Sequence, residues 1–128
     1  MIDLHSTPEP CVAFLGLRVE EVRPEFCRMR LPFRPELCQA QGVVHGGFIA
    51  SLIDSAGIHA VLWQPDPAIT RGGTTNLTVS YLAAARAVDL IAEARVLRRG
   101  RRVVFVEVDV MAPDGIPIAK GLVTYHLA

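Results

Sequence analysis

Apolar residues dominate one long segment in the middle of the chain. From His45 to about Trp63 they recur at the helical period of about 3.6 residues and occupy nearly every side of the helix. The apolar residues of this segment are Phe48, Ile49, Leu52, Ile53, Ala56, Ala60, Val61 and Leu62. Pro65 and Pro67 end the helix. A helix that is apolar nearly all round has to be buried, so we expect a sheet to wrap around it.

After this helix the pattern alternates with a period of two, which is typical of half-buried strands. The alternating segments are residues 74–81, 88–96, 104–110 and 119–127. Tight-turn signals at Arg99-Gly100 and Asp114-Gly115 lie between them. We expect a meander of antiparallel strands with one apolar face and one mixed face.

The segment before the long helix carries weaker signals. Residues 8–14 predict a short helix that Gly16 ends. Residues 17–22 and 26–31 predict the two strands of a hairpin. One long buried helix with an antiparallel sheet is an α+β architecture. A chain of 128 residues is long enough for one core and too short for two, so residues 1–128 are predicted to form a single domain.

Composition and charge narrow the class of protein. The chain is 51% hydrophobic and 20% charged, with a formal net charge of +0, which indicates a globular protein without a default affinity for nucleic acid or an anionic membrane. Its mean hydropathy of +0.34 indicates either apolar surface buried between subunits or a well-filled core. The three cysteines form no metal-binding pattern and fit a reducing compartment. Because no segment has the length of a membrane span and the first residues lack signal-peptide features, we expect a cytoplasmic protein.

The start of the long helix carries the candidate chemistry. His45-Gly46-Gly47 precedes the apolar segment, and free N–H groups at a helix N-terminus can hold developing negative charge. Glycine also lets a ligand approach the backbone closely, which makes Gly47 a candidate for substrate binding beside Gly46. The alternative is that the two glycines only permit a tight turn into the helix.

Asp54 is the one carboxylate of this helix. A carboxylate among apolar residues can act as a general base or a nucleophile. It can also be a structural group whose partner is Ser51, Ser55 or a neighbouring backbone group. No G-x-S-x-G segment or phosphate-binding glycine loop is present, and the histidines have no metal-binding spacing, so we expect no metal site.

Two stretches of the chain together resemble a known family. One runs from Gln39 to Ala56 and has His-Gly-Gly at the helix start with an Asp eight residues after Gly46; the other runs from Gly72 to Leu77 and continues into the strand of Tyr81. They resemble the hotdog-fold acyl-CoA thioesterases, most closely the phenylacetate-pathway (PaaI-like) type. The resemblance covers nearly the whole chain.

The resemblance implies a hotdog fold, in which an antiparallel sheet wraps around one long central helix. It implies a homodimer with a continuous sheet, often assembled into a tetramer of two dimers. The implied substrate is an acyl-CoA, with an aromatic (aryl-acetyl-like) acyl group as the first candidate and a medium-chain group as the second. Coenzyme A is part of that substrate, so no separate cofactor is expected.

The resemblance also implies roles for individual residues. Asp54 would attack the thioester carbonyl or activate the water that does, and the N–H of Gly46 would bind the thioester oxygen. His45 would shape the turn and contact the substrate.

Three further polar residues match positions that relatives use. Gln39 stands where many relatives have Asn, and there it would bind the attacking water or the leaving thiolate; Gln41 is the alternative if the loop is shifted. Thr74 falls where relatives often place a Ser or Thr that orients water. Asn76 is expected to share a strand face with Thr74 because strand side chains alternate, which makes it a candidate for substrate binding.

Arginine residues offer a candidate site for the phosphates of coenzyme A. Arg98-Arg99-Gly100-Arg101-Arg102 forms a basic turn, and a guanidinium is suited to bidentate phosphate contacts. Arg99, Arg101 and also Arg71 are therefore candidates. The alternative is that the basic turn only keeps a surface loop solvated.

The spacing along the helix constrains where a site can form. Gly46 and Asp54 are eight residues apart, about 12 Å at a rise of 1.5 Å per residue, which is too far for both to contact one carbonyl. A symmetric dimer that brings Gly46 of one chain to Asp54 of the other would solve this. Two alternatives to a thioesterase remain: a non-catalytic acyl-CoA-binding sensor, and a hotdog hydratase that uses His45 with Asp54.

Overall fold

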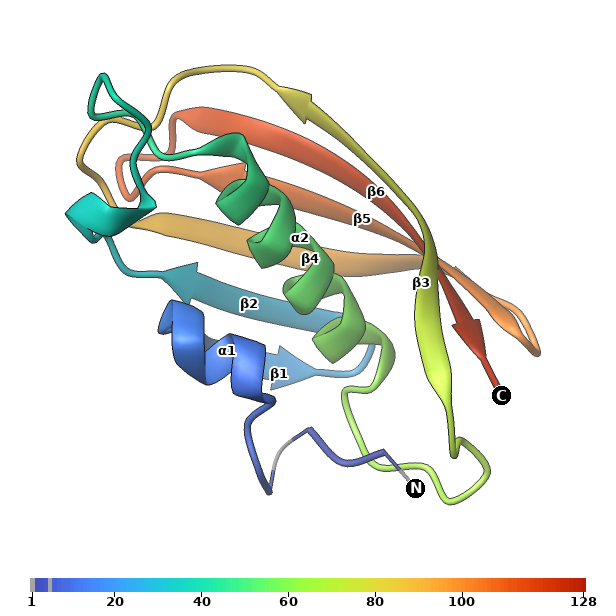
Figure 1. The fold of residues 1–128 in the computed structure, drawn as a ribbon. Helices are drawn as coiled ribbons and strands as arrows, with labels where there is room; N and C mark the ends of the chain where they lie inside the picture. Colours follow the sequence, from blue (N-terminus) through green and yellow to red (C-terminus); the bar gives the residue numbers. More distant parts are fainter. Residues whose placement is uncertain (1, 5) are drawn as a thin grey trace.

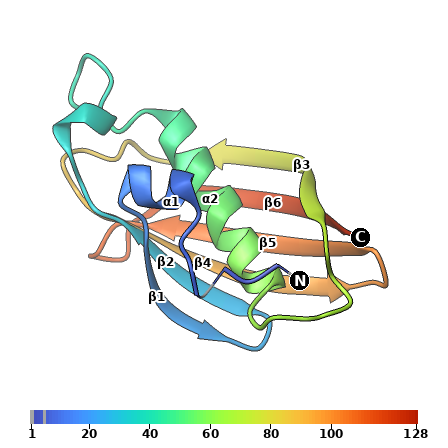
Figure 2. The ribbon, with the colours of Figure 1, turned by 60° about the horizontal axis from the view of Figure 1, so that its bottom comes forward.

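The described residues form one six-stranded antiparallel sheet that curves around a single long helix. A computed structural model describes residues 2–4 and 6–128, so Met1 and His5 lie outside the described residues. Figures 1 and 2 show helix α2 along the concave face of the sheet, with the short helix α1 on the same side. The elements are α1 (Pro10–Leu15), β1 (Arg18–Arg23), β2 (Phe26–Leu31), a 3-10 turn (Pro35–Leu37), α2 (Gly46–Val61), β3 (Gly72–Tyr81), β4 (Leu90–Arg99), β5 (Val103–Met111) and β6 (Pro117–Leu127).

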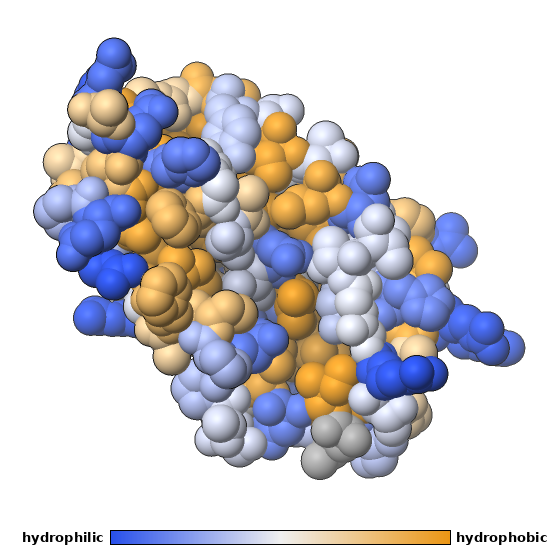
Figure 3. Space-filling view, in the orientation of Figure 1, coloured by the Kyte–Doolittle hydropathy of each residue, from blue (hydrophilic) through white to orange (hydrophobic). Residues whose placement is uncertain are grey.

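Helix α2 confirms the prediction of a long buried helix between His45 and Trp63. Its buried residues are Ile49, Leu52, Ile53, Ser55, Ala56, Gly57, His59, Ala60 and Val61. Gly47 is exposed and Ala50, Ser51, Asp54 and Ile58 are only half-buried, so one side of the helix reaches the surface. In Figure 3, this face of the molecule carries apolar and polar side chains side by side. None of the described helices has the length and apolar content that crossing a lipid bilayer requires.

The order of strands in the sheet is β1-β2-β4-β5-β6-β3. Strands β4, β5 and β6 form the predicted meander, but the expectation that all four alternating segments form one meander is wrong for β3. That strand pairs with β6 at the edge of the sheet, because β2 pairs with the side of β4 that a continuous meander would have given to β3. The chain from β3 to β4 therefore crosses over the start of α2, where the N–H of Val44 donates to the carbonyl of Ala85 at 2.9 Å (Figure 1).

A bulge in β3 places Thr74 and Asn76 on opposite faces of the sheet. Thr74 pairs with Tyr125 and Asn76 pairs with the preceding residue of β6, Thr124, so Thr75 is an extra residue in β3. Adjacent residues of β6 point to opposite faces, and buried Tyr125 belongs to the face that packs on α2. The prediction that Thr74 and Asn76 share a face assumed unbroken alternation and is wrong.

Gly121 of β6 lies directly under the middle of α2. A Cβ at this position would overlap Cγ2 of Ile53, a fully buried side chain. Cγ2 sits on a branched β-carbon next to the helix backbone and has little freedom to move away. We expect Gly121→Ala to lower the free energy of unfolding by roughly 1–3 kcal/mol, measured by chemical denaturation.

Gly73→Ala is the matched control for this substitution. Gly73 also lies in a strand, but a Cβ there meets no atom within 4 Å. Steric overlap predicts a loss of stability for Gly121→Ala only, and an equal loss in both variants would contradict it.

Candidate active site

The first turn of α2 holds its backbone groups in a fixed arrangement. His45 is the N-cap, and its Nδ1 accepts a hydrogen bond from the N–H of Gly47 at 3.0 Å. The hydroxyl of Tyr81 donates to the carbonyl oxygen of Gly46 at 2.7 Å. The peptide group that joins Gly46 to Gly47 is therefore held at both ends.

The N–H groups of the two glycines have different surroundings. The N–H of Gly47 is used by His45, whereas the N–H of Gly46 has no acceptor among residues 2–4 and 6–128. The Gly46 N–H also lies at the positive end of the helix dipole, where an anion is favoured. Of the two glycines, Gly46 therefore offers a free N–H donor among the described residues, whereas the N–H of Gly47 is already occupied.

Tyr81 explains why position 46 is a glycine. A Cβ on Gly46 would lie 3.0 Å from Cζ and Oη of Tyr81, so the aromatic ring fills the space that a side chain would need. The sequence pattern assigns Tyr81 only to the end of a strand, and it therefore missed this contact. The contact arises because β3 lies at the sheet edge beside the start of α2.

Gln39 belongs to the loop before α2 and lines the same cavity as Gly46. Its N–H donates to the carbonyl of Val43 at 2.8 Å, and its own carbonyl accepts from Gly42, which fixes the backbone of the loop. Gln39 and Gly46 share a cavity of about 380 Å³ with mainly apolar walls. The other lining residues are Val43, Val44, Ile49, Tyr81, Leu82, Ala83, Ala84 and Ala85.

Asp54 is held by the sheet and not by its own helix. The hydroxyl of Thr74 donates to Oδ1 of Asp54 at 2.6 Å across the gap between β3 and α2. The alternative partner Ser51 points elsewhere, because its hydroxyl donates to the carbonyl of Gly47 at 2.9 Å. Asp54 is half-buried, so a reactant can reach the carboxylate. The structure thus brings together Asp54 and Thr74, which are 20 residues apart in the chain.

Tyr125 lies beneath this pair as the strand partner of Thr74. Burial raises the pKa of its phenol, and the negative charges of Glu9 and Asp54 raise it further. Tyr125 therefore stays a neutral hydroxyl at ordinary pH. It adds no second negative charge next to Asp54.

Comparison with known proteins identifies the family of this chain. Residues 41–119, which include the helix start, Asp54 and Thr74, match the family model of the thioesterase superfamily. The chain belongs to the thioesterase superfamily. Its sequence is 42% identical over 106 residues to the Halobacterium salinarum protein VNG_1336C, to which an esterase activity is ascribed, with 80% of this chain and 70% of that protein covered. It is 29% identical over 125 residues to the medium/long-chain acyl-CoA thioesterase YigI of Escherichia coli K12, with 87% and 81% covered.

Solved structures place this thioesterase within the hotdog fold. The E. coli PaaI protein from the phenylacetic acid degradation operon superposes with a TM-score of 0.87 at 19% identity, over 94% of this chain and 86% of that one. The Pseudomonas aeruginosa protein PA5202 superposes with a TM-score of 0.85 at 28% identity, over 94% of both chains. These matches confirm the predicted hotdog fold and the resemblance to the PaaI-like type. Membership of the superfamily makes the chain a thioester hydrolase.

The remaining predicted residues lie away from Asp54 and Gly46. Asn76 is exposed on the outer face of the thioesterase sheet, where its Oδ1 accepts from the hydroxyl of Thr78 at 3.2 Å. Arg99 and Arg101 line a cavity at the end of the sheet where β6 ends. The backbone N–H of Arg71 donates to the carbonyl of Ala128, which lines the same cavity. Within the described part of the chain, no group of three or more His, Cys, Asp or Glu side chains lies close enough to hold a metal ion.

Proposed function

We propose that this thioesterase hydrolyses an acyl-CoA to the free acid and coenzyme A. The observation that carries the proposal is the hydrogen bond of 2.6 Å from Thr74 to Asp54, which orients a surface-accessible carboxylate on an otherwise apolar helix. A carboxylate in this position can attack a thioester carbonyl or accept a proton from an attacking water. Thr74 would hold the carboxylate and the water in place.

The reaction needs a donor for the oxygen that becomes negative. When water attacks the thioester carbon, its proton passes to Asp54 and the carbonyl oxygen becomes an oxyanion. The unpaired N–H of Gly46 is suited to bind this oxyanion at a helix N-terminus. Collapse of the intermediate then breaks the C–S bond and releases the thiolate of coenzyme A. Asp54 transfers its proton to this thiolate and returns to the carboxylate form. Gln39, in the same cavity as Gly46, would bind the water or the thiolate.

The proposed active enzyme is a homodimer with two equivalent sites. Gly46 and Asp54 lie in one straight helix about 12 Å apart, so each carbonyl would meet Gly46 of one subunit and Asp54 of the other. The edge of the sheet supports this arrangement: among the described residues β3 pairs only with β6, which leaves its other side free for a strand of a second copy. Two such dimers would form the expected tetramer.

The acyl group is proposed to be apolar. The cavity beside Gly46 has mainly aliphatic walls, formed by Val43, Val44, Ile49 and Leu82 with three alanines. The name of YigI describes medium- and long-chain acyl-CoA substrates, whereas PaaI belongs to a phenylacetic acid operon. Both the aromatic and the medium-chain candidates therefore stand, and YigI is the more similar of the two relatives in sequence.

A panel of acyl-CoA substrates tests the proposal. We expect thiol release from at least one aryl-acetyl-CoA or medium-chain acyl-CoA, with no added metal or cofactor, measured with a chromogenic thiol reagent. The substrate with the highest kcat/KM would identify the preferred acyl chain length or aromatic ring. Binding of acyl-CoAs without hydrolysis of any would refute the proposed activity.

A further inference from the structure

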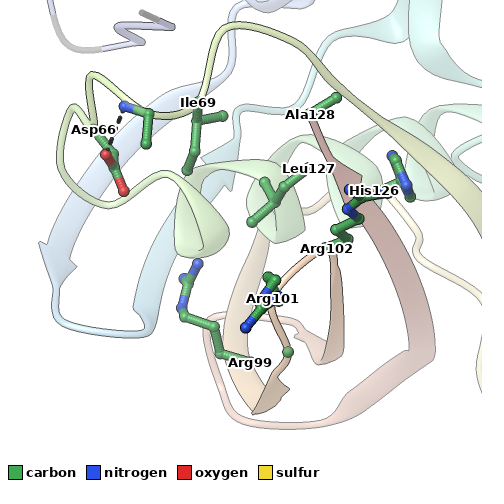
Figure 4. A pocket seen from close by; sticks show the side chains of 10 residues that line it. Asp66, Ile69, Arg99, Arg101, Arg102, His126, Leu127 and Ala128 are labelled. Atoms are coloured by element: carbon green, nitrogen blue, oxygen red, sulfur yellow. Dashed lines mark hydrogen bonds between the residues drawn. The ribbon is translucent and has the colours of Figure 1, made fainter.

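A second cavity lies at the other end of α2 from Gly46. Its volume is about 560 Å³, within the range of pockets that hold small ligands. The β4–β5 turn, the segment after α2 and the end of β6 enclose it (Figure 4). The lining residues are Asp66, Ala68, Ile69, Arg99, Gly100, Arg101, Arg102, His126, Leu127 and Ala128. We call it the hairpin pocket.

The arginines of the hairpin pocket have two different roles. Arg99 is structural: its guanidinium bonds the carboxylate of Glu25 at 2.7 Å and the carbonyl of Val61 at 2.8 Å, which ties the β4–β5 turn to the end of α2. Arg101 and Arg102 are exposed, and neither side chain has a hydrogen bond or an ion pair with any residue in 2–4 and 6–128. Two guanidinium groups are therefore available for an anion, and His126 lies beside them.

The remaining walls of the hairpin pocket combine apolar side chains with one carboxylate. Ile69 and Leu127 supply apolar surface, and Figure 4 shows Asp66 and Ile69 across the pocket from Arg101. Oδ1 of Asp66 accepts from the N–H of Ala68 at 2.9 Å, so its other oxygen is left to accept from an amino or hydroxyl group. The pocket thus combines cationic, apolar and acceptor groups.

We infer that the hairpin pocket binds the phosphorylated adenosine of the acyl-CoA. Arg101 and Arg102 would contact a phosphate, since guanidinium groups bind phosphate in bidentate geometry. The adenine would lie against Ile69 and Leu127, with Asp66 as an acceptor. The inference rests on the proposed function and deepens it, because it assigns recognition of the carrier to residues remote from the reacting carbonyl.

The position of the pocket suits this ligand. Coenzyme A carries its thiol and its nucleotide at opposite ends of the pantetheine arm, so a nucleotide site must lie apart from the carbonyl. Arg99 links the pocket to Val61 at the end of α2. Val61 is seven residues after Asp54, so the two residues are about 10 Å apart along the helix axis at 1.5 Å per residue. A free phosphorylated adenosine that acts as an effector has the same chemistry. Kinetics with and without the nucleotide part of the substrate distinguish it from the nucleotide of the acyl-CoA.

The test compares two substrates that differ only in the nucleotide. For the double variant Arg101→Ala with Arg102→Ala, we expect the KM for the best acyl-CoA to rise roughly ten- to hundredfold, the size of losing charge-assisted hydrogen bonds. We expect kcat, and all parameters for the matching acyl-pantetheine, to stay at wild-type values. Arg98→Ala is the control for each of the two single variants, because it removes one guanidinium from the same hairpin at a residue that does not line the pocket.

The outcomes separate the pocket from the proposed function. A rise in KM that is equal for acyl-CoA and acyl-pantetheine, or equal in the single variants and the Arg98→Ala control, would overturn the inference. So would loss of adenosine 3′,5′-bisphosphate binding with an unchanged KM for acyl-CoA, since the pocket would then serve a free effector. If the wild type hydrolyses neither substrate, the proposed function fails. Calorimetry with adenosine 3′,5′-bisphosphate then decides alone: binding that the double variant loses upholds a nucleotide site, and no binding overturns it.

Discussion

Asp54→Asn is expected to lower kcat on the best thioester substrate by roughly 10²–10⁴-fold, the usual contribution of a general base or nucleophile. Asparagine has the same shape and can still accept from the hydroxyl of Thr74 at its Oδ1, so the geometry of the site should survive. It cannot take a proton from water or attack a carbonyl as a carboxylate does. Steady-state kinetics of the variant, with denaturation curves to confirm its fold, measure the effect.

Variants of Thr74 serve as controls for this result. Thr74→Val keeps the carboxylate but removes the hydroxyl that orients it, so a smaller loss of kcat is expected than for Asp54→Asn. Thr74→Ser restores the hydroxyl and should recover most of that loss. Wild-type kcat in Asp54→Asn would show that another group does the chemistry.

Gly46→Pro is expected to lower kcat by roughly 10²–10³-fold, because it removes the one N–H proposed to bind the oxyanion. The fold should accept the change. Gly46 is the first residue of α2, a position where proline is favoured. His45 before it has φ −63° and ψ 133°, the extended conformation that a residue before proline requires. No hydrogen bond to a described residue is lost with this N–H.

Gly46→Ala is the matched control for the proline variant. Alanine brings the same Cβ to 3.0 Å from the ring of Tyr81 but keeps the N–H. If the donor matters, the alanine variant loses much less activity than the proline variant. Similar losses in the two variants would instead assign the effect to displacement of Tyr81.

A mixture of the two inactive proteins tests whether the site is shared between subunits. A heterodimer of Asp54→Asn with Gly46→Pro has one site in which both groups are intact, so random exchange of subunits should restore about a quarter of wild-type activity. A site inside one chain would leave every subunit defective. In that case the mixture would stay inactive, and the shared site would be refuted.

Local patterns in the chain determined the elements of the fold and the identity of the candidate residues. The 3.6-residue period between His45 and Trp63 predicted α2, and the period of two predicted β3 to β6, because each period reflects how side chains leave a regular backbone. The positions of Gly46 and Asp54 on one helix follow from the same period. Residue type alone indicated which groups could serve as donor and base.

Only the tertiary structure decided which of these groups meet. The partner of β3 depends on which side of β4 the distant strand β2 occupies, and no local period records that choice. The bulge at Thr75 places Asn76 on the face of the sheet opposite to Thr74, so Thr74 reaches Asp54 and Asn76 does not. Arg99 was a candidate for phosphate by its charge, but Glu25, 74 residues away in the chain, holds its guanidinium. Side-chain chemistry is local and can be found in the sequence, whereas contacts between remote elements depend on how the whole chain packs.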